Sequence, residues 1–116
     1  ADSGYLHALT GGRHLLAGEN MGITEMQMVM EQNLTAWMSL IEQDLDPDTD
    51  VVRYRDDGSE SHAPLGIRLA QALHHGTDHR SQVCTVLTTL GIEPPEIDVW
   101  DFADKDGRLS ETPPTV

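Results

Sequence analysis

Residues 64–90 read PLGIRLAQALHHGTDHRSQVCTVLTTL, and this stretch decides the fold of the chain. Its apolar residues recur at spacings of three and four, which places them on one face of a helix. Pro64 suits the first turn, where the missing N–H costs nothing, and Gly91 suits the end. The stretch therefore predicts one long helix over about 64–90. Its apolar face consists of Leu65, Leu69, Ala72, Gly76, Val83, Val86, Leu87 and Leu90.

A second amphipathic helix is predicted over about 24–45, ending before Pro47. Thr24 would be its N-cap and Gln27 the capping-box partner three residues on. Its apolar stripe spans a sector of about 100°, so its methionines and tryptophan are expected to be core residues. This stripe consists of Ile23, Met26, Met30, Leu34, Trp37, Ile41 and Leu45.

The remaining segments are shorter and less regular. Residues 2–9 fit the last turns of a helix that glycine stops, and residues 11–22, with four glycines, fit a connector. Val51–Arg55 is β-prone and Asp57-Gly58 follows it as a turn signal, so a small hairpin or an extended loop is expected. Residues 103–116 are expected to form a loose acidic tail.

Length and charge restrict the classes of partner. The chain has 116 residues, enough for a single domain over 1–116 and too few for two. Lys+Arg number 7 against 20 Asp+Glu, which gives a net charge of −13. Such a surface repels phosphate backbones and anionic bilayers, so neither nucleic acid nor membrane is an expected partner. No apolar run reaches the length of a membrane span.

Cysteine usage favours a reducing compartment. Cys84 is the single cysteine, so no disulfide can form within the chain. It lies beside the apolar face of the helix over 64–90 and is interpreted as a small core residue. No secretory signal is visible, and a cytoplasmic location is expected.

The histidines carry the chemical information. Two of the six, His75 and His79, are four residues apart on the predicted helix and therefore share a face. This spacing allows two imidazoles to chelate one first-row metal ion, although no glutamate lies between them as in HExxH proteases. Hydrogen bonds to an Asp or Glu on a facing helix would satisfy the same two rings. His74 is expected to face solvent.

The block HGTDHRSQV at 75–83, followed by Leu90-Gly91-Ile92 and Pro94-Pro95, resembles the last long helix of the DinB-like (DinB/YfiT-like) superfamily. That helix typically reads HxxxHRxQ and ends in Leu-Gly-x-x-Pro-Pro. Residues 5–11 resemble the end of the family's second helix, and residues 24–45 resemble its third. The resemblance thus covers nearly the whole chain from the second helix onward.

This resemblance implies an all-α, up-down four-helix bundle that binds a divalent metal, nickel or zinc, through three histidines. Two ligands map onto His75 and His79. The third belongs to the second helix, at a position before residue 1, and neither His7 nor His14 occupies it. The family's activities imply a metal-dependent hydrolase or a thiol-dependent S-transferase that acts on a small-molecule substrate.

Two polar residues follow the histidine pair on the same helix. Gln82 is a candidate for orienting a ligand histidine or a bound water, and a plain helix–helix hydrogen bond is the alternative. Arg80 is a candidate for binding a substrate carboxylate, and a structural ion pair is equally compatible with the sequence.

Two long helices cannot bury both of their apolar faces alone. We expect the bundle to be completed by helices from a missing N-terminal part or by a second copy in a homodimer. The apolar stripe of the helix over 24–45 is the expected contact face. The rival function is a non-catalytic helical dimerisation or stress-response module with structural histidines.

Overall fold

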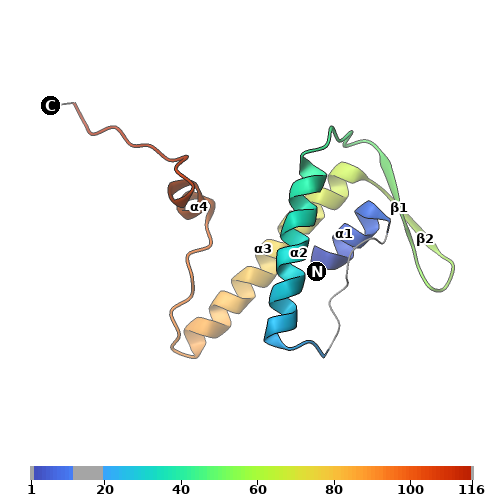
Figure 1. Ribbon diagram of the computed structural model, residues 1–116, viewed down its shortest axis with the longest axis horizontal. Coiled ribbons are helices and arrows are strands. Elements are labelled where there is room, and N and C mark those ends of the chain that lie inside the picture. Colours follow the sequence, from blue (N-terminus) through green and yellow to red (C-terminus); the bar gives the residue numbers. More distant parts are fainter. Residues whose placement is uncertain (1, 12–19, 116) are drawn as a thin grey trace. The chain divides into compact units, whose positions relative to one another are not determined.

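The computed structural model describes residues 2–11 and 20–115, with side chains described from Gly4 onward (Figure 1). Its elements are α1 (Asp2–Thr10), α2 (Ile23–Ile41), β1 (Asp50–Tyr54), β2 (Glu60–Pro64), α3 (Leu65–Thr89) and α4 (Val99–Lys105). The chain divides into two compact units, the first ending at His79 and the second beginning at Arg80. The boundary falls within α3, so each unit contains one part of that helix.

The predicted fold class is wrong. Instead of an all-α four-helix bundle, the described residues form four helices and a two-stranded antiparallel sheet, a mixed α/β architecture. The two long helices lie close to where they were predicted, at Ile23–Ile41 and Leu65–Thr89. The segment between them forms a paired β-ladder, and the fourth helix has only seven residues.

Helix α2 begins and ends differently from the prediction. Gly22 is its N-cap, and the Glu25 carboxylate accepts a hydrogen bond from the Gly22 backbone N–H at 3.4 Å, so Thr24 lies inside the first turn. The helix ends at Ile41. Three acids, Glu42, Asp44 and Asp46, follow at the negative end of the helix dipole, where negative charge disfavours further helical turns.

The side of α2 that is buried is not the predicted apolar stripe. Its buried residues are Val29, Asn33 and Leu40, whereas the residues that directly follow them are 57% exposed or more. A shift of one residue corresponds to about 100° around a helix. The stripe therefore faces away from the core, and the prediction that its methionines are core residues is wrong. Its exposed members are Ile23, Met26, Met30, Leu34 and Ile41.

Strands β1 and β2 form the small hairpin that the sequence allowed. Val52 pairs with His62 in the antiparallel register, and Tyr54 pairs with Glu60. The turn closes with a 2.9 Å hydrogen bond from the Arg55 N–H to the Ser59 carbonyl, and Gly58 has a φ of 82°. This left-handed conformation is one that glycine adopts without steric cost, which explains the Asp-Gly signal.

Arg68 on α3 holds the hairpin against the helix. Its Nε and Nη2 donate to the Val51 carbonyl at 3.1 and 2.8 Å, and Nη2 also donates to the Ser61 carbonyl at 2.7 Å. One guanidinium thus contacts both strands. Because side chains alternate across a strand, the hairpin has an inner face that includes Arg53 and an outer face that includes His62.

The start of α3 is fixed by the loop that follows α2. The Leu65 N–H donates to the Thr49 carbonyl at 2.8 Å, and the Gly66 N–H donates to the Pro47 carbonyl at 2.9 Å. These bonds satisfy two donors that a helix N-terminus leaves without partners. A Cβ on Gly66 would lie 3.1 Å from the Pro47 Cβ, so the close approach favours glycine. Pro64, expected as the first helical residue, is instead the last residue of β2.

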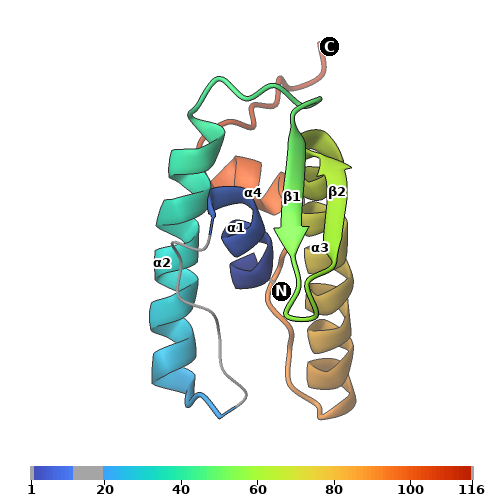
Figure 2. The ribbon, with the colours of Figure 1, turned by 90° about the vertical axis from the view of Figure 1, so that its right-hand side faces the viewer.

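The core of the first unit forms around α1, which lies between α2 and the hairpin (Figure 2). Leu6 on α1 is the central residue, with 0% of its surface exposed. Val29 and Leu40 are buried on α2, and Leu65 and Ala72 are buried on α3. The short α1 therefore supplies the fully buried residue at the centre of this core.

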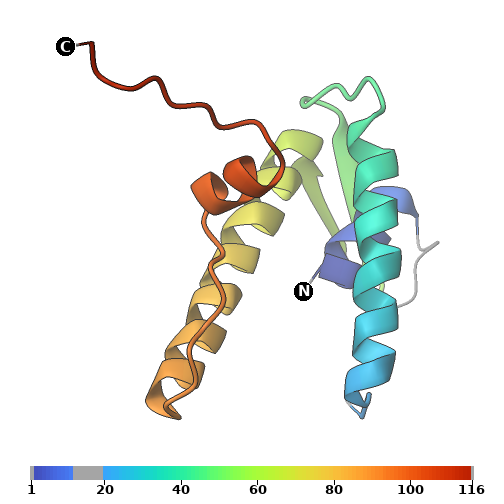
Figure 3. The same ribbon diagram turned by 60° about the vertical axis from the view of Figure 1, so that its left-hand side comes forward.

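The second unit contains two helix ends of the same type. At the end of α3, the Ile92 N–H donates to the Leu87 carbonyl at 2.9 Å and Gly91 has a φ of 72°, as the sequence predicted. Helix α4 starts at Asp98, whose carboxylate accepts from the Asp101 N–H at 2.7 Å, and ends in the same glycine motif at Gly107. An extended segment follows α4 (Figure 3). None of the helices in the described part of the chain is long and apolar enough to cross a bilayer.

Replacing Leu6 with alanine is expected to destabilise the first unit by about 3 kcal/mol, because the cavity forms at the fully buried centre of the core. Leu73, which is 72% exposed, provides the matched control, and its alanine variant should change stability by less than about 0.5 kcal/mol. Urea unfolding measures both. Equal losses in the two variants would contradict this assignment of the core.

Candidate functional site

The histidine pair on α3 is the strongest candidate site. The Nε2 atoms of His75 and His79 lie 2.9 Å apart, and their ring centroids are separated by 4.3 Å at an interplanar angle of 85°. The helix places the two residues one turn apart, and both rings turn their Nε2 atoms toward the same point. The prediction that they share a face is confirmed.

The surroundings of the two rings differ. His75 is half-buried, whereas His79 is exposed. Tyr5 on α1 packs against His75 edge to face, with ring centroids 6.1 Å apart and an angle of 71°. The pair is therefore covered by α1 on the His75 side and open on the His79 side. The sequence analysis gave Tyr5 no role at this site, because no local pattern links α1 with α3.

The geometry of the pair fits two neighbouring ligands of one metal ion. Bonds from a metal to imidazole nitrogens measure about 2.0–2.1 Å, so two of them at a right angle place the nitrogens about 3 Å apart. Among residues 2–11 and 20–115, no three His, Cys, Asp or Glu side chains group to form a metal site. The expected third ligand falls before residue 1, and His14 lies outside the described residues. His7, on α1, is exposed.

The other residues singled out by the sequence lie nearby on α3. The His74 side chain is 76% exposed, with its Nε2 3.8 Å from the Asp78 carboxylate, as expected for a residue that faces solvent. Arg80 and Gln82 belong to the second unit and are both exposed. Their roles in binding or orienting a ligand remain predictions.

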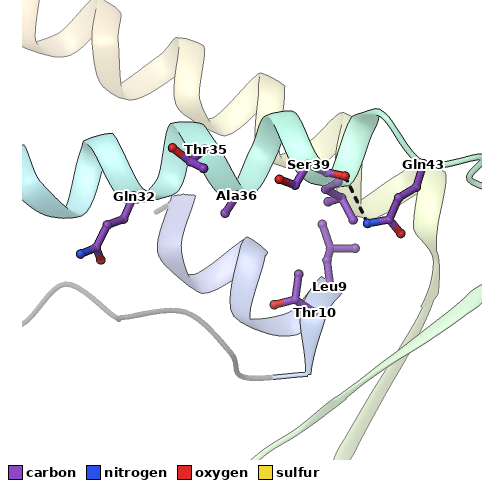
Figure 4. A pocket seen from close by; sticks show the side chains of 8 residues that line it. Leu9, Thr10, Gln32, Thr35, Ala36, Ser39 and Gln43 are labelled. Atoms are coloured by element: carbon purple, nitrogen blue, oxygen red, sulfur yellow. Dashed lines mark hydrogen bonds between the residues drawn. The ribbon is translucent and has the colours of Figure 1, made fainter.

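A groove lies between the end of α1 and the second half of α2 (Figure 4). Its volume is about 710 Å³, and the Gln43 amide donates to the Ser39 carbonyl at its edge at 3.2 Å. The described residues that line it are neutral, and they offer hydrogen bonds and apolar contact. The lining residues are Leu9, Thr10, Gln32, Thr35, Ala36, Ser39, Leu40 and Gln43.

A second titratable cluster lies on the outer face of the hairpin. His62 Nδ1 is 2.7 Å from the Asp50 carboxylate, and Nε2 is 3.0 Å from the Glu60 carboxylate. The hydrogen bond to Asp50, then that to Glu60, raises the pKa of His62 above its ordinary value of 6.5. The sequence analysis missed this cluster, because Asp50 reaches His62 only through the cross-strand register.

The raised pKa of His62 determines the sign of its pH effect. The folded hairpin binds this proton more tightly than the unfolded chain does, so its stabilising contribution is complete below pH 6.5. That contribution is lost as the pH rises through the raised pKa. The free energy of unfolding of the native chain should therefore exceed that of His62→Gln by an amount that shrinks over this range.

Proton NMR of the imidazole measures the pKa directly. In Asp50→Asn the pKa of His62 should fall toward 6.5, because the hydrogen bond to Asp50, which is the largest cause of the shift, is removed. Glu60→Gln should lower it less. An unchanged midpoint in Asp50→Asn would contradict this account.

Comparison with known proteins identifies no relative. No protein-family model, no curated protein and no solved structure matches this chain. The resemblance to the DinB-like superfamily therefore rests on the sequence alone, chiefly on the residues of the 75–95 block.

Proposed function

We propose that the chain is a DinB-like protein that binds a divalent metal ion, nickel or zinc, through His75 and His79. The observation that carries the proposal is the 2.9 Å separation of the two Nε2 atoms, which suits two ligands on one ion. The HxxxHRxQ pattern supports it independently. An ion held by two protein ligands keeps open positions for a third ligand and for a substrate.

The proposed activity is hydrolysis or thiol S-transfer on a small-molecule substrate. A bound divalent metal would supply a Lewis acid at the two histidines. Tyr5 restrains the His75 ring by its edge-to-face contact, while the exposed side of His79 leaves a way in for a ligand. A cytoplasmic location belongs to the same proposal, since a lone cysteine suits a reducing compartment.

A non-catalytic module with structural histidines is the second candidate. The same 2.9 Å separation is a good hydrogen-bond length when one Nε2–H donates to the other Nε2. In that case the pair would help to hold α1 against α3 through Tyr5, with no metal required. The two candidates differ in whether a metal ion binds.

Calorimetric titration of the chain with Ni²⁺ and with Zn²⁺ distinguishes the two candidate functions. His75→Ala and His79→Ala should each weaken binding by at least about tenfold, because each removes one of two converging ligands. His74→Ala is the matched control and should leave the affinity unchanged. Equal weakening in all three variants, or no saturable binding by the native chain, would favour the structural role.

We further propose that the partner of α2 is a second copy of the chain. Ile23, Met30 and Leu34 on its apolar stripe are 75%, 69% and 64% exposed. Nineteen helical residues extend about 28 Å, and the spacing of three and four along the stripe suits the seam of two paired helices. α2 contains two glutamates and no lysine or arginine, so salt should strengthen the pairing by screening repulsion.

Sedimentation equilibrium tests this association. Leu34→Glu should shift the native dimer to monomer, because a charge enters the apolar seam. Gln32→Glu adds the same charge on another side of α2 and should leave the dimer intact. A native chain that stays monomeric at high and low salt would contradict the proposal.

A further inference from the structure

A small hollow lies between α1 and the inner face of the hairpin. Its volume is about 240 Å³, and it is lined by Gly4, Tyr5, Ala8, Arg53 and Arg68. Pockets that enclose a whole small-molecule ligand usually measure about 300–1,000 Å³. The hollow therefore has the size to hold one end of a ligand, with the rest lying outside it.

The hollow is positively charged within a strongly acidic chain. Two of the chain's seven Lys and Arg residues line it, and none of the lining residues whose side chains the structure describes is acidic. The two acids of the hairpin strands, Asp50 and Glu60, pair with His62 on its outer face. The alternation of side chains along the strands thus separates Arg53 from these carboxylates.

Both guanidinium groups have donors left for a ligand. Arg68 uses Nε and Nη2 on the Val51 and Ser61 carbonyls, which fixes its plane. Its Nη1 makes no hydrogen bond to another described residue. Arg53 likewise has neither a hydrogen bond nor an ion pair with any side chain that the structure describes, over residues 4–11 and 20–115. A guanidinium edge matches the two oxygens of a carboxylate, and such charge-assisted pairs are strong.

The hollow and the histidine pair adjoin each other. Tyr5 lines the hollow and also contacts His75. On α3, His75 and His79 follow Arg68 by seven and eleven residues, which places each within about 20° of the Arg68 direction around the helix. The corresponding rises along the axis are about 10 and 16 Å.

We propose that this hollow binds the carboxylate end of a small molecule whose reacting group reaches His75 and His79. The second half of this statement rests on the proposed function, whereas carboxylate binding itself does not. Gly4, Ala8 and the Tyr5 ring offer apolar contact to a short methylene chain. A carboxylate with an apolar chain therefore fits the hollow better than a phosphate does. Phosphate also binds guanidinium groups, but it has no apolar part to contact Gly4, Ala8 and the Tyr5 ring.

Butyrate and inorganic phosphate are the probes, titrated at constant ionic strength into the metal-free chain and followed by NMR of the Gly4 amide and the arginine Nε–H groups. Butyrate should bind saturably and more tightly than phosphate. Tighter binding of phosphate, or no saturation with butyrate, would overturn the proposal.

Arg53→Ala should weaken butyrate binding by at least about tenfold, through loss of the charge-assisted bonds. Arg55→Ala is the matched control: it removes the same charge from the hairpin turn, where Arg55 contacts Ser59 at 3.1 Å, and should change the affinity less than about twofold. Equal weakening in the two variants would mean that butyrate responds only to the net charge of the chain, and it would overturn the proposal.

A third variant, Gly4→Leu, fills the hollow while keeping both arginines. A Cβ at Gly4 meets no atom within 4 Å, and leucine favours the helix, so the variant should fold and lose butyrate binding. Retained binding would contradict the location. Because butyrate is titrated without metal, its failure leaves the metal titration intact. Conversely, failure of metal binding with intact butyrate binding would refute only the proposed function.

Discussion

The first unit depends on one guanidinium group. Arg68 donates to a carbonyl of each strand, and it does so from the helix that carries the histidine pair. A two-stranded hairpin is at best marginally stable by itself in water, so this attachment gives the hairpin a fixed orientation. The inner face of the hairpin then meets α1, and α1 in turn covers His75 through Tyr5. The attachment of the hairpin to α3 by Arg68 thus sets the surface against which α1 packs, and α1 carries Tyr5 to His75.

The elements of the fold could largely be predicted from local sequence. Spacings of three and four identify α2 and α3, Gly91 marks the end of α3, and the Val-Val and Asp-Gly pairs indicate the hairpin. Their assembly could not be predicted in the same way, because it rests on contacts between distant residues. Arg68 and Val51 are 17 residues apart. A hydrogen bond from a side chain to a distant backbone carbonyl leaves no periodic pattern in the sequence. The all-α fold class came from the family resemblance, and it was kept although Val51–Arg55 and Asp57-Gly58 already indicated a small hairpin.

The candidate site likewise has one part that local sequence predicts and another that depends on contacts between distant residues. The pairing of His75 and His79 follows from helical geometry alone, so the sequence was sufficient to find it. Tyr5, Arg53 and Arg68 gather only when α1 and the hairpin meet α3, and each is unremarkable within its own segment. The burial of α2 shows the same limit. The spacing of apolar residues identifies the predicted stripe of α2. However, α1 packs against a different side of α2, where Val29 and Leu40 are buried.

The alternation of the hairpin limits which insertions and deletions this chain can accept. Adding or removing one residue between Asp50 and Arg53 would shift one of the two relative to β2, and would so place either Arg53 on the outer face or Asp50 on the inner face, away from His62. Changes of two residues preserve both faces, and changes confined to the turn between Arg55 and Ser59 leave the strand register untouched. Length variation among sequences of this type should therefore collect at the hairpin turn, and within the strands it should occur in steps of two.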